Sequence, residues 1–133
     1  MSDEVEALMR KARRTVRAGY RLLSGGFAEE ATSESYYAKF YAAKAMLLSE
    51  GKRLSQHKHV IRAFEELLVE TRRVDRRFLA SLDAGLRLRH SADYETDLAF
   101  TISEEQARES LKSAEEFLDM AEGFLNERMQ GNL

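Results

Sequence analysis

The sequence of 133 residues contains no proline, no cysteine and no tryptophan. A chain of this length would ordinarily carry about six prolines, so their absence is informative. A proline inside a helix costs about 3 kcal/mol, whereas loop-rich folds and β-sandwiches use proline in their turns. The absence of proline therefore favours long uninterrupted helices. The absence of cysteine excludes disulfides, cysteine-ligated zinc and thiol catalysis.

No single sign of charge dominates the chain, which has 21 basic and 23 acidic residues and a net charge of −2. This total indicates no global preference for nucleic acid or for a membrane surface. Fifteen of the basic residues are arginine, which suits bidentate contacts to phosphate and carboxylate. No apolar run approaches the ~18 residues of a membrane span, and the opening MSDEVEALMRK lacks the apolar region of a secretory signal. We therefore expect a cytoplasmic protein that does not associate with a membrane.

A few glycines and short polar stretches divide the chain into helical segments. We expect five helices, at about 3–24, 27–50, 57–71, 75–94 and 103–129. No segment shows the alternation of apolar and polar residues that indicates a strand. Ser103 and Gln106 form a capping box at the start of the last helix, since each side chain can satisfy a backbone amide of the other residue. With no linker in sight, residues 1–133 are expected to form one all-α domain.

The segment 35–48, SYYAKFYAAKAMLL, is apolar nearly all round, with Lys39 and Lys44 as its charged residues. A helix of that kind is buried on most sides. It is therefore either the central helix of the fold or covered by a second subunit. Its tyrosines, Tyr37 and Tyr41 among them, supply bulk to a core. Because buried hydroxyls need partners, some of them could instead line a polar cleft.

The helix expected at 75–94 has an inward stripe that ends in charges. Phe78, Leu82 and Leu86 lie on one arc, and the same arc continues to Arg89 and Asp93. Charges rarely lie on a core-facing arc unless they are paired or functional. Either the two charges form a structural salt bridge, or the arginine is placed to hold a phosphate or another anion.

Two groups of arginines could follow a nucleic-acid backbone. The first group lies on the outer arc of the first helix, opposite its apolar side: Arg10, Arg14, Arg17 and Arg21. The second group lies between the third and fourth helices: Arg72, Arg73, Arg76 and Arg77. The alternative for the first group is a solvated face directed at the acidic last helix, because residues 101–133 hold eight acidic and three basic residues.

The three histidines, His57, His59 and His90, do not form a metal-binding pattern. A zinc site needs three or four ligands, and His57 and His59, two residues apart, do not share a helix face. The sequence also has no glycine loop that could cradle a phosphate ahead of a lysine, and no Gly-x-Ser-x-Gly motif. We expect no metal and no cofactor, which leaves arginine, histidine and tyrosine as the candidate chemistry.

Taken together, these features resemble the HEPN domain family, and in particular its small stand-alone members from bacteria and archaea. The resemblance rests on the helix SYYAKFYAAKAMLLSEG, on His57 at the start of the next helix, on the segment from Arg89 to Tyr94, and on the closing helix. It covers residues 5–128 in order. It implies an up-and-down bundle of four long helices plus a short fifth helix, usually assembled as a homodimer.

The first function that the resemblance implies is that of a binding protein. Many HEPN domains are toxins paired with a minimal nucleotidyltransferase, and ribonuclease members carry an arginine, four to six residues, and then a histidine on a late helix. Arg89 matches that arginine, but Tyr94 stands where the histidine is expected. In this reading the chain is the helical partner of a nucleotidyltransferase, and Arg89, Asp93, Tyr94, Tyr37 and Tyr41 bind a nucleotide or RNA in a cleft.

The second function is that of an active, metal-independent HEPN ribonuclease. In this alternative Arg89 holds the scissile phosphate, and His90 or His57 transfers the proton as the ribose 2′-hydroxyl attacks. A histidine with a pKa near 6.5 suits that task, whereas a tyrosine with a pKa near 10 is a poor base at neutral pH. The resemblance also makes Tyr94 the nearest candidate for modification by the nucleotidyltransferase.

Overall fold

The computed structural model describes residues 2–94 and 101–131, with the backbone alone for residues 91–94. All regular structure in these ranges is helical. The elements are α1 (Asp3–Ser24), α2 (Ala28–Ser49), α3 (His57–Phe64), the π-helical turn η1 (Glu65–Val69), α4 (Arg76–Tyr94) and α5 (Glu104–Met129). The five expected helices are confirmed, with ends within one or two residues of the predicted ones except for the helix that begins at His57.

Local sequence explains where the helices begin and end. The side chain of Ser2 accepts a hydrogen bond from the amide of Val5 and caps α1. The predicted capping box of Ser103 and Gln106 is present at the start of α5. The turn after α1 contains Gly26 at φ +90°, and the turn after α2 contains Gly51 at φ +82°. Glycine adopts this left-handed backbone without the steric cost that other residues pay.

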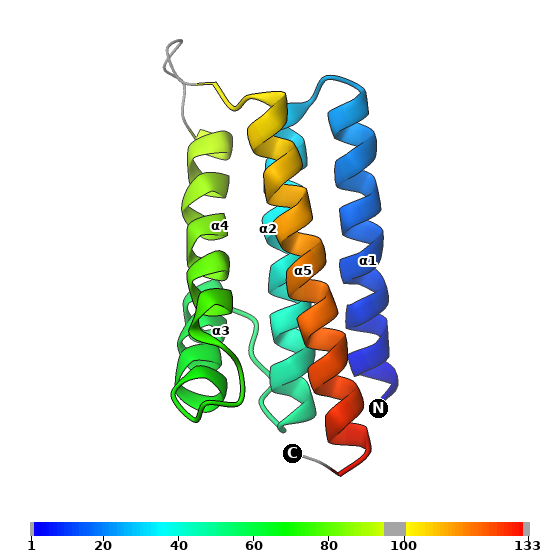
Figure 1. Ribbon diagram of the computed structural model, residues 1–133, viewed down its shortest axis with the longest axis vertical. Coiled ribbons are helices and arrows are strands. Elements are labelled where there is room, and N and C mark those ends of the chain that lie inside the picture. Colours follow the sequence, from blue (N-terminus) through cyan, green and yellow to red (C-terminus); the bar gives the residue numbers. More distant parts are fainter. Residues whose placement is uncertain (1, 95–100, 132–133) are drawn as a thin grey trace.

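The four long helices form an up-and-down bundle (Figure 1). α1 and α5 pack against each other and against α2, and α4 packs mainly on the other side of α2. The start of α1 and the end of α5 lie at the same end of the bundle as the short α3, which packs against α2 and α4 (Figure 1). The expected all-α bundle is therefore confirmed. None of the described helices combines the length and apolar composition that a bilayer crossing requires.

α2 is the central helix of the bundle. It contacts α1, α3, α4 and α5, and residues on every side of it are buried, including Ala31, Tyr36 and Met46 at 1% exposure or less. The apolar sequence of this helix is therefore explained within one chain, and a second subunit is not needed to cover it. Homodimer formation remains a prediction that rests on the family resemblance alone.

Aromatic packing fixes α4 and α5 against the short helix. The ring of Phe117 on α5 lies 5.6 Å from that of Phe64 on α3 and 6.0 Å from that of Phe78 on α4, measured between centroids. All three residues are buried. This contact sets the position of α3, whose first residue, His57, belongs to the site described below.

The predicted helix at 57–71 changes its hydrogen bonding halfway. It is an α-helix only to Phe64, and a π-helical turn follows, in which the amide of Glu70 donates to the carbonyl of Glu65 at 2.8 Å. Neighbouring residues Leu68 and Val69 are both buried. Such π-helical turns occur as short insertions within α-helices.

Candidate functional site

Arg89 lies where the inward stripe of α4 meets α2. Its guanidinium donates a hydrogen bond to the hydroxyl of Tyr37 and lies 4.8 Å from the centroid of the Tyr37 ring. The residue is half-buried. The tyrosine on α2 therefore orients the arginine on α4, both by a hydrogen bond and by a cation–π contact.

His57 joins the same place from the start of α3. Its Nδ1 lies 2.8 Å from the hydroxyl of Tyr36, and its ring stacks on Phe40 at a centroid distance of 4.1 Å and an angle of 15°. The edge of the ring also faces Tyr37, at a centroid distance of 6.2 Å. We call the five residues Tyr36, Tyr37, Phe40, His57 and Arg89 the Tyr–Arg–His cluster.

The electrostatics of the cluster keep His57 neutral at physiological pH. Burial lowers the pKa of His57, and the positive charges of Arg89, His90 and Lys44 lower it further. Burial raises the pKa of the Tyr36 hydroxyl, so this group keeps its proton. Among the side chains that the structure describes, each charged group that acts on the pKa of His57 is a cation.

The burial of the Tyr36 hydroxyl, which lies 2.8 Å from Nδ1, lets us infer which nitrogen of His57 carries the proton. Tyr36 is fully buried, and a buried phenol needs an acceptor. The Nδ1 of a neutral imidazole provides that acceptor, which leaves the imidazole proton on Nε2. In this arrangement Nε2 can donate a hydrogen bond to an anion, but it cannot take up a proton.

Two lysines extend the cluster along the same side of α2. The ammonium of Lys11, on α1, lies 4.6 Å from the ring centroid of Tyr41, and Tyr41 stacks on Tyr37 at 6.3 Å. The ammonium of Lys44 lies 5.7 Å from the ring centroid of Phe40. Lys11, Lys44 and Arg89 thus lie against aromatic rings of α2, of which Tyr37 and Tyr41 are partly exposed and Phe40 is buried. Cations beside partly exposed rings suit a phosphorylated ligand with stacking bases.

The structure brings together most of the residues predicted for the site. Arg89, His57, Tyr37 and Tyr41 lie in or beside the cluster. His90 is exposed, and its charge is close enough to lower the pKa of His57. The side chains of the other two predicted residues, at positions 93 and 94, lie outside the described part of the chain.

Sequence reasoning placed Tyr36 and Phe40 in the core and did not assign Lys44 or Lys11 to the site. Lys44 lies seven residues after Tyr37 and three after Tyr41, a helical spacing that could have revealed it. Lys11 comes from another helix, and no local pattern connects it to Tyr41. Within the described ranges, no three histidine, aspartate or glutamate side chains gather closely enough to hold a metal ion.

The second predicted basic group, between η1 and α4, is largely engaged by neighbours. Arg73 pairs with Glu50, and Arg76 pairs with Glu65 at 3.6 Å. The guanidinium of Arg77 lies over the ring of the adjacent phenylalanine at 4.3 Å. Because these three arginines already have partners, their charge is explained without a nucleic-acid surface at this turn.

The class of this protein is an all-α bundle with a candidate site between α2, α3 and α4. An arginine, a histidine and two tyrosines meet at this site. The family model described as HEPN domain matches residues 5–124, and the chain belongs to the HEPN domain family. The family resemblance seen in the sequence is thereby confirmed.

Several relatives match over nearly the full length of the chain. A candidate toxin of Methanocaldococcus jannaschii is 29% identical over 122 residues, which are 92% of this chain and 82% of that protein. A second candidate toxin of the same organism is 30% identical over 125 residues, or 94% and 91%. A UPF0332 protein of Archaeoglobus fulgidus is 33% identical over 124 residues, or 93% and 97%.

Proposed function

We propose that the chain binds RNA or a nucleotide through phosphate groups held at the Tyr–Arg–His cluster, as the helical partner of a minimal nucleotidyltransferase. The carrying observation is that Arg89, held by Tyr37, acts together with other cations on the neutral His57. A guanidinium suits a phosphate because it can donate two parallel hydrogen bonds. Family membership and the naming of two relatives as candidate toxins support the pairing with a second protein.

Proton placement favours binding over cleavage. A ribonuclease of this kind needs a base that accepts the 2′-hydroxyl proton, and a lowered pKa makes His57 a weaker base. In the tautomer inferred from the burial of Tyr36, its hydroxyl donates to Nδ1 and the proton of the neutral imidazole lies on Nε2. As a hydrogen-bond donor, however, Nε2 can stabilise a bound phosphate without any change of protonation.

The binding test compares two arginines on the same helix. Arg89→Gln removes the guanidinium held by Tyr37, whereas Arg87→Gln removes an exposed guanidinium that pairs with Asp83 at 2.7 Å. A charge-assisted hydrogen bond contributes about 1.5–3 kcal/mol, so Arg89→Gln should weaken RNA binding by about tenfold or more. Arg87→Gln should bind RNA with an affinity close to that of the wild type. Equal affinities for both variants in fluorescence anisotropy would contradict the proposed site.

The ribonuclease alternative is tested on the same proteins. A labelled RNA is incubated for hours with excess protein in EDTA, and its length is followed on a denaturing gel. The binding proposal predicts that the RNA stays intact with wild type and with both variants. Cleavage by wild type that is lost with Arg89→Gln would establish the ribonuclease instead.

The partner is tested by co-expression. The proposal predicts a minimal nucleotidyltransferase reading frame beside the gene for this chain, and a stable complex when both are expressed with an affinity tag on one of them. The pairing is refuted if the genome has no such neighbour and the chain forms no complex with nucleotidyltransferases encoded elsewhere in it. That result would not affect the proposed binding site.

A further inference from the structure

The outer side of α1 carries a row of four arginines that the Tyr–Arg–His cluster does not explain. Their spacing of four, three and four residues places them on one face of the helix, over about 16 Å of its length. All four are exposed. We call this set the arginine row: Arg10, Arg14, Arg17 and Arg21.

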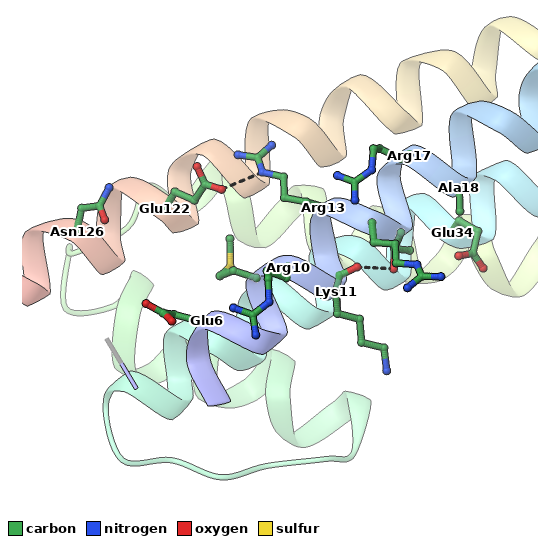
Figure 2. Close-up of a pocket in the computed structure, with 12 residues that line it drawn as sticks. Glu6, Arg10, Lys11, Arg13, Arg17, Ala18, Glu34, Glu122 and Asn126 are labelled. Atoms are coloured by element: carbon green, nitrogen blue, oxygen red, sulfur yellow. Dashed lines mark hydrogen bonds and ion pairs between the residues drawn. The ribbon is translucent and has the colours of Figure 1, made fainter. Parts of the chain in front are cut away.

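The row lacks the carboxylate partners that most other arginines have. In residues 2–90 and 101–131, none of the four guanidinium groups has an ion pair or a hydrogen bond. Eight other arginines do pair with a carboxylate: 13, 53, 62, 73, 76, 87, 108 and 128. In these ranges no ion pair neutralises the row, although Glu6, Glu34 and Glu122 line the same hollow as Arg10, Arg14 and Arg17 (Figure 2).

The acidic last helix does not neutralise the row. Arg13, which lies outside the row, pairs with Glu122 at 2.9 Å (Figure 2) and also with Asp119 at 2.8 Å. Tyr20 bonds to Glu115 of the same helix. The row is exposed, as the alternative of a solvated face expects, and Arg10, Arg14 and Arg17 line the same hollow as Glu122 and Asn126 of α5. The ion pairs with the acidic helix in the described ranges are made by Arg13.

The row continues toward the cluster through Lys11. This lysine lies one residue after Arg10 and three before Arg14, and its ammonium lies over Tyr41, which stacks on Tyr37. Tyr37 in turn holds Arg89. A ligand long enough to contact the row and Lys11 would lead directly into the Tyr–Arg–His cluster.

A polyanion with a regular backbone fits these features better than an acidic protein surface. Protein interfaces centre on buried apolar or aromatic anchors. The large apolar side chains that stand well exposed in the described ranges are Phe27 and Met129, and neither lies within the row. Phosphate contacts, by contrast, need only cations placed along the strand.

We propose that the arginine row and Lys11 form a track for the phosphate backbone of a single RNA strand, which leads one end of the strand into the Tyr–Arg–His cluster. This inference rests on the proposed function, and it selects RNA over a free nucleotide as the ligand. The row supplies affinity along the backbone without reading the sequence, and the cluster holds one phosphate with the neighbouring bases.

The experiment measures how salt weakens binding of the full chain to a labelled, unstructured 20-nucleotide RNA. The test variant replaces the four arginines of the row by glutamine. The control variant replaces four exposed arginines that have carboxylate partners, and therefore carries the same change in net charge: Arg53, Arg62, Arg87 and Arg108. Circular dichroism verifies that both variants are folded.

The logarithm of the RNA-binding constant falls linearly with the logarithm of the salt concentration. For a single strand, each phosphate contact makes this slope steeper by about 0.7. The row variant should therefore lose about 3 from this slope and bind RNA more weakly at low salt. The control should keep the wild-type slope within about 1, and a mononucleotide, which reaches only the cluster, should bind wild type and row variant alike. Equal slopes for the row and control variants would overturn the track.

The remaining outcomes separate the track from the proposed function. If Arg89→Gln weakens RNA binding and the row variant does not, the cluster stands and the track is refuted. If wild type binds neither RNA nor a mononucleotide, both proposals fail. If poly-glutamate binds in a row-dependent manner and RNA does not bind, the row is a docking surface for an acidic protein, and the RNA track is overturned.

Discussion

Lys39 is buried at 4% exposure on α2, and replacing it should make the protein more stable at neutral pH. Its ammonium has one hydrogen bond, to the carbonyl of Ser81 on α4 at 3.3 Å. Burial lowers the pKa of Lys39 to about 8, although the negative charge of Glu116 acts to raise it. Lys39→Met keeps the length and apolar character of the side chain and removes the charge.

The expected magnitude follows from the pKa of Lys39 in the folded and unfolded states. The unfolded value is 10.5 and the folded value about 8, so the unfolded chain binds more protons between these two pH values. Stability of the wild type therefore rises with pH across this window, and the full penalty applies below pH 8. At about 1.36 kcal/mol for each pKa unit, the buried charge costs about 3 kcal/mol at pH 7.

The substitution also removes the hydrogen bond to Ser81, which is worth about 1 kcal/mol. The net gain of Lys39→Met at pH 7 should thus be about 2 kcal/mol. Between pH 7 and pH 10, the free energy of unfolding of the variant relative to wild type should fall by about 2–3 kcal/mol, because the wild type loses its buried charge.

The assay is urea unfolding followed by circular dichroism at several pH values between 7 and 10. Lys58→Met, at an exposed position on α3, controls for the loss of one positive charge. If the stability difference between Lys39→Met and wild type changes by less than about 0.5 kcal/mol over this range, the ammonium is not destabilising and the reasoning is refuted.

Substitutions at Gly19, Gly123 and Arg89 test the packing and the site. Gly19→Ala should cost about 1–3 kcal/mol in urea unfolding, because its Cβ would come within 2.5 Å of Leu111 Cδ2, a buried side chain. No loss would mean that the Leu111 side chain can move aside without cost. Gly123→Ala, which meets nothing within 4 Å, should instead gain up to about 1 kcal/mol from helix propensity. Arg89→Gln should raise the pKa of His57 in an NMR titration, whereas Arg89→Lys should keep it low; identical titrations of both variants would contradict the electrostatics of the cluster.

Much of the fold could be predicted from the sequence because it depends on residues close together in the chain. The absence of proline, the capping box at Ser103 and the glycines at the turns are local signals, and they place most helix ends within one or two residues. The all-round apolarity of 35–48 correctly indicated a buried helix. The π-helical turn after Phe64 was not predicted, because no residue pattern in this segment distinguishes its hydrogen bonding from that of an α-helix.

The candidate site was predicted only in part. Periodicity alone placed Arg89 on the inward arc of α4, and the sequence also indicated His57, Tyr37 and Tyr41 as candidate site residues. That Tyr37 holds Arg89 and that Tyr36 bonds to His57 depends on the alignment of α2 with α3 and α4, across separations of 52 and 21 residues. No helical periodicity contains that information.

The arginine row illustrates the same division. The sequence by itself determined that four arginines share one face of α1, because a helix repeats every 3.6 residues. Only the tertiary structure decided what that face meets, because the packing angle of α1 on α5 turns Arg13 toward the acidic helix and the row toward solvent. Helical periodicity depends on residues close together in the chain, whereas the ion-pair partners of a side chain depend on how the helices pack.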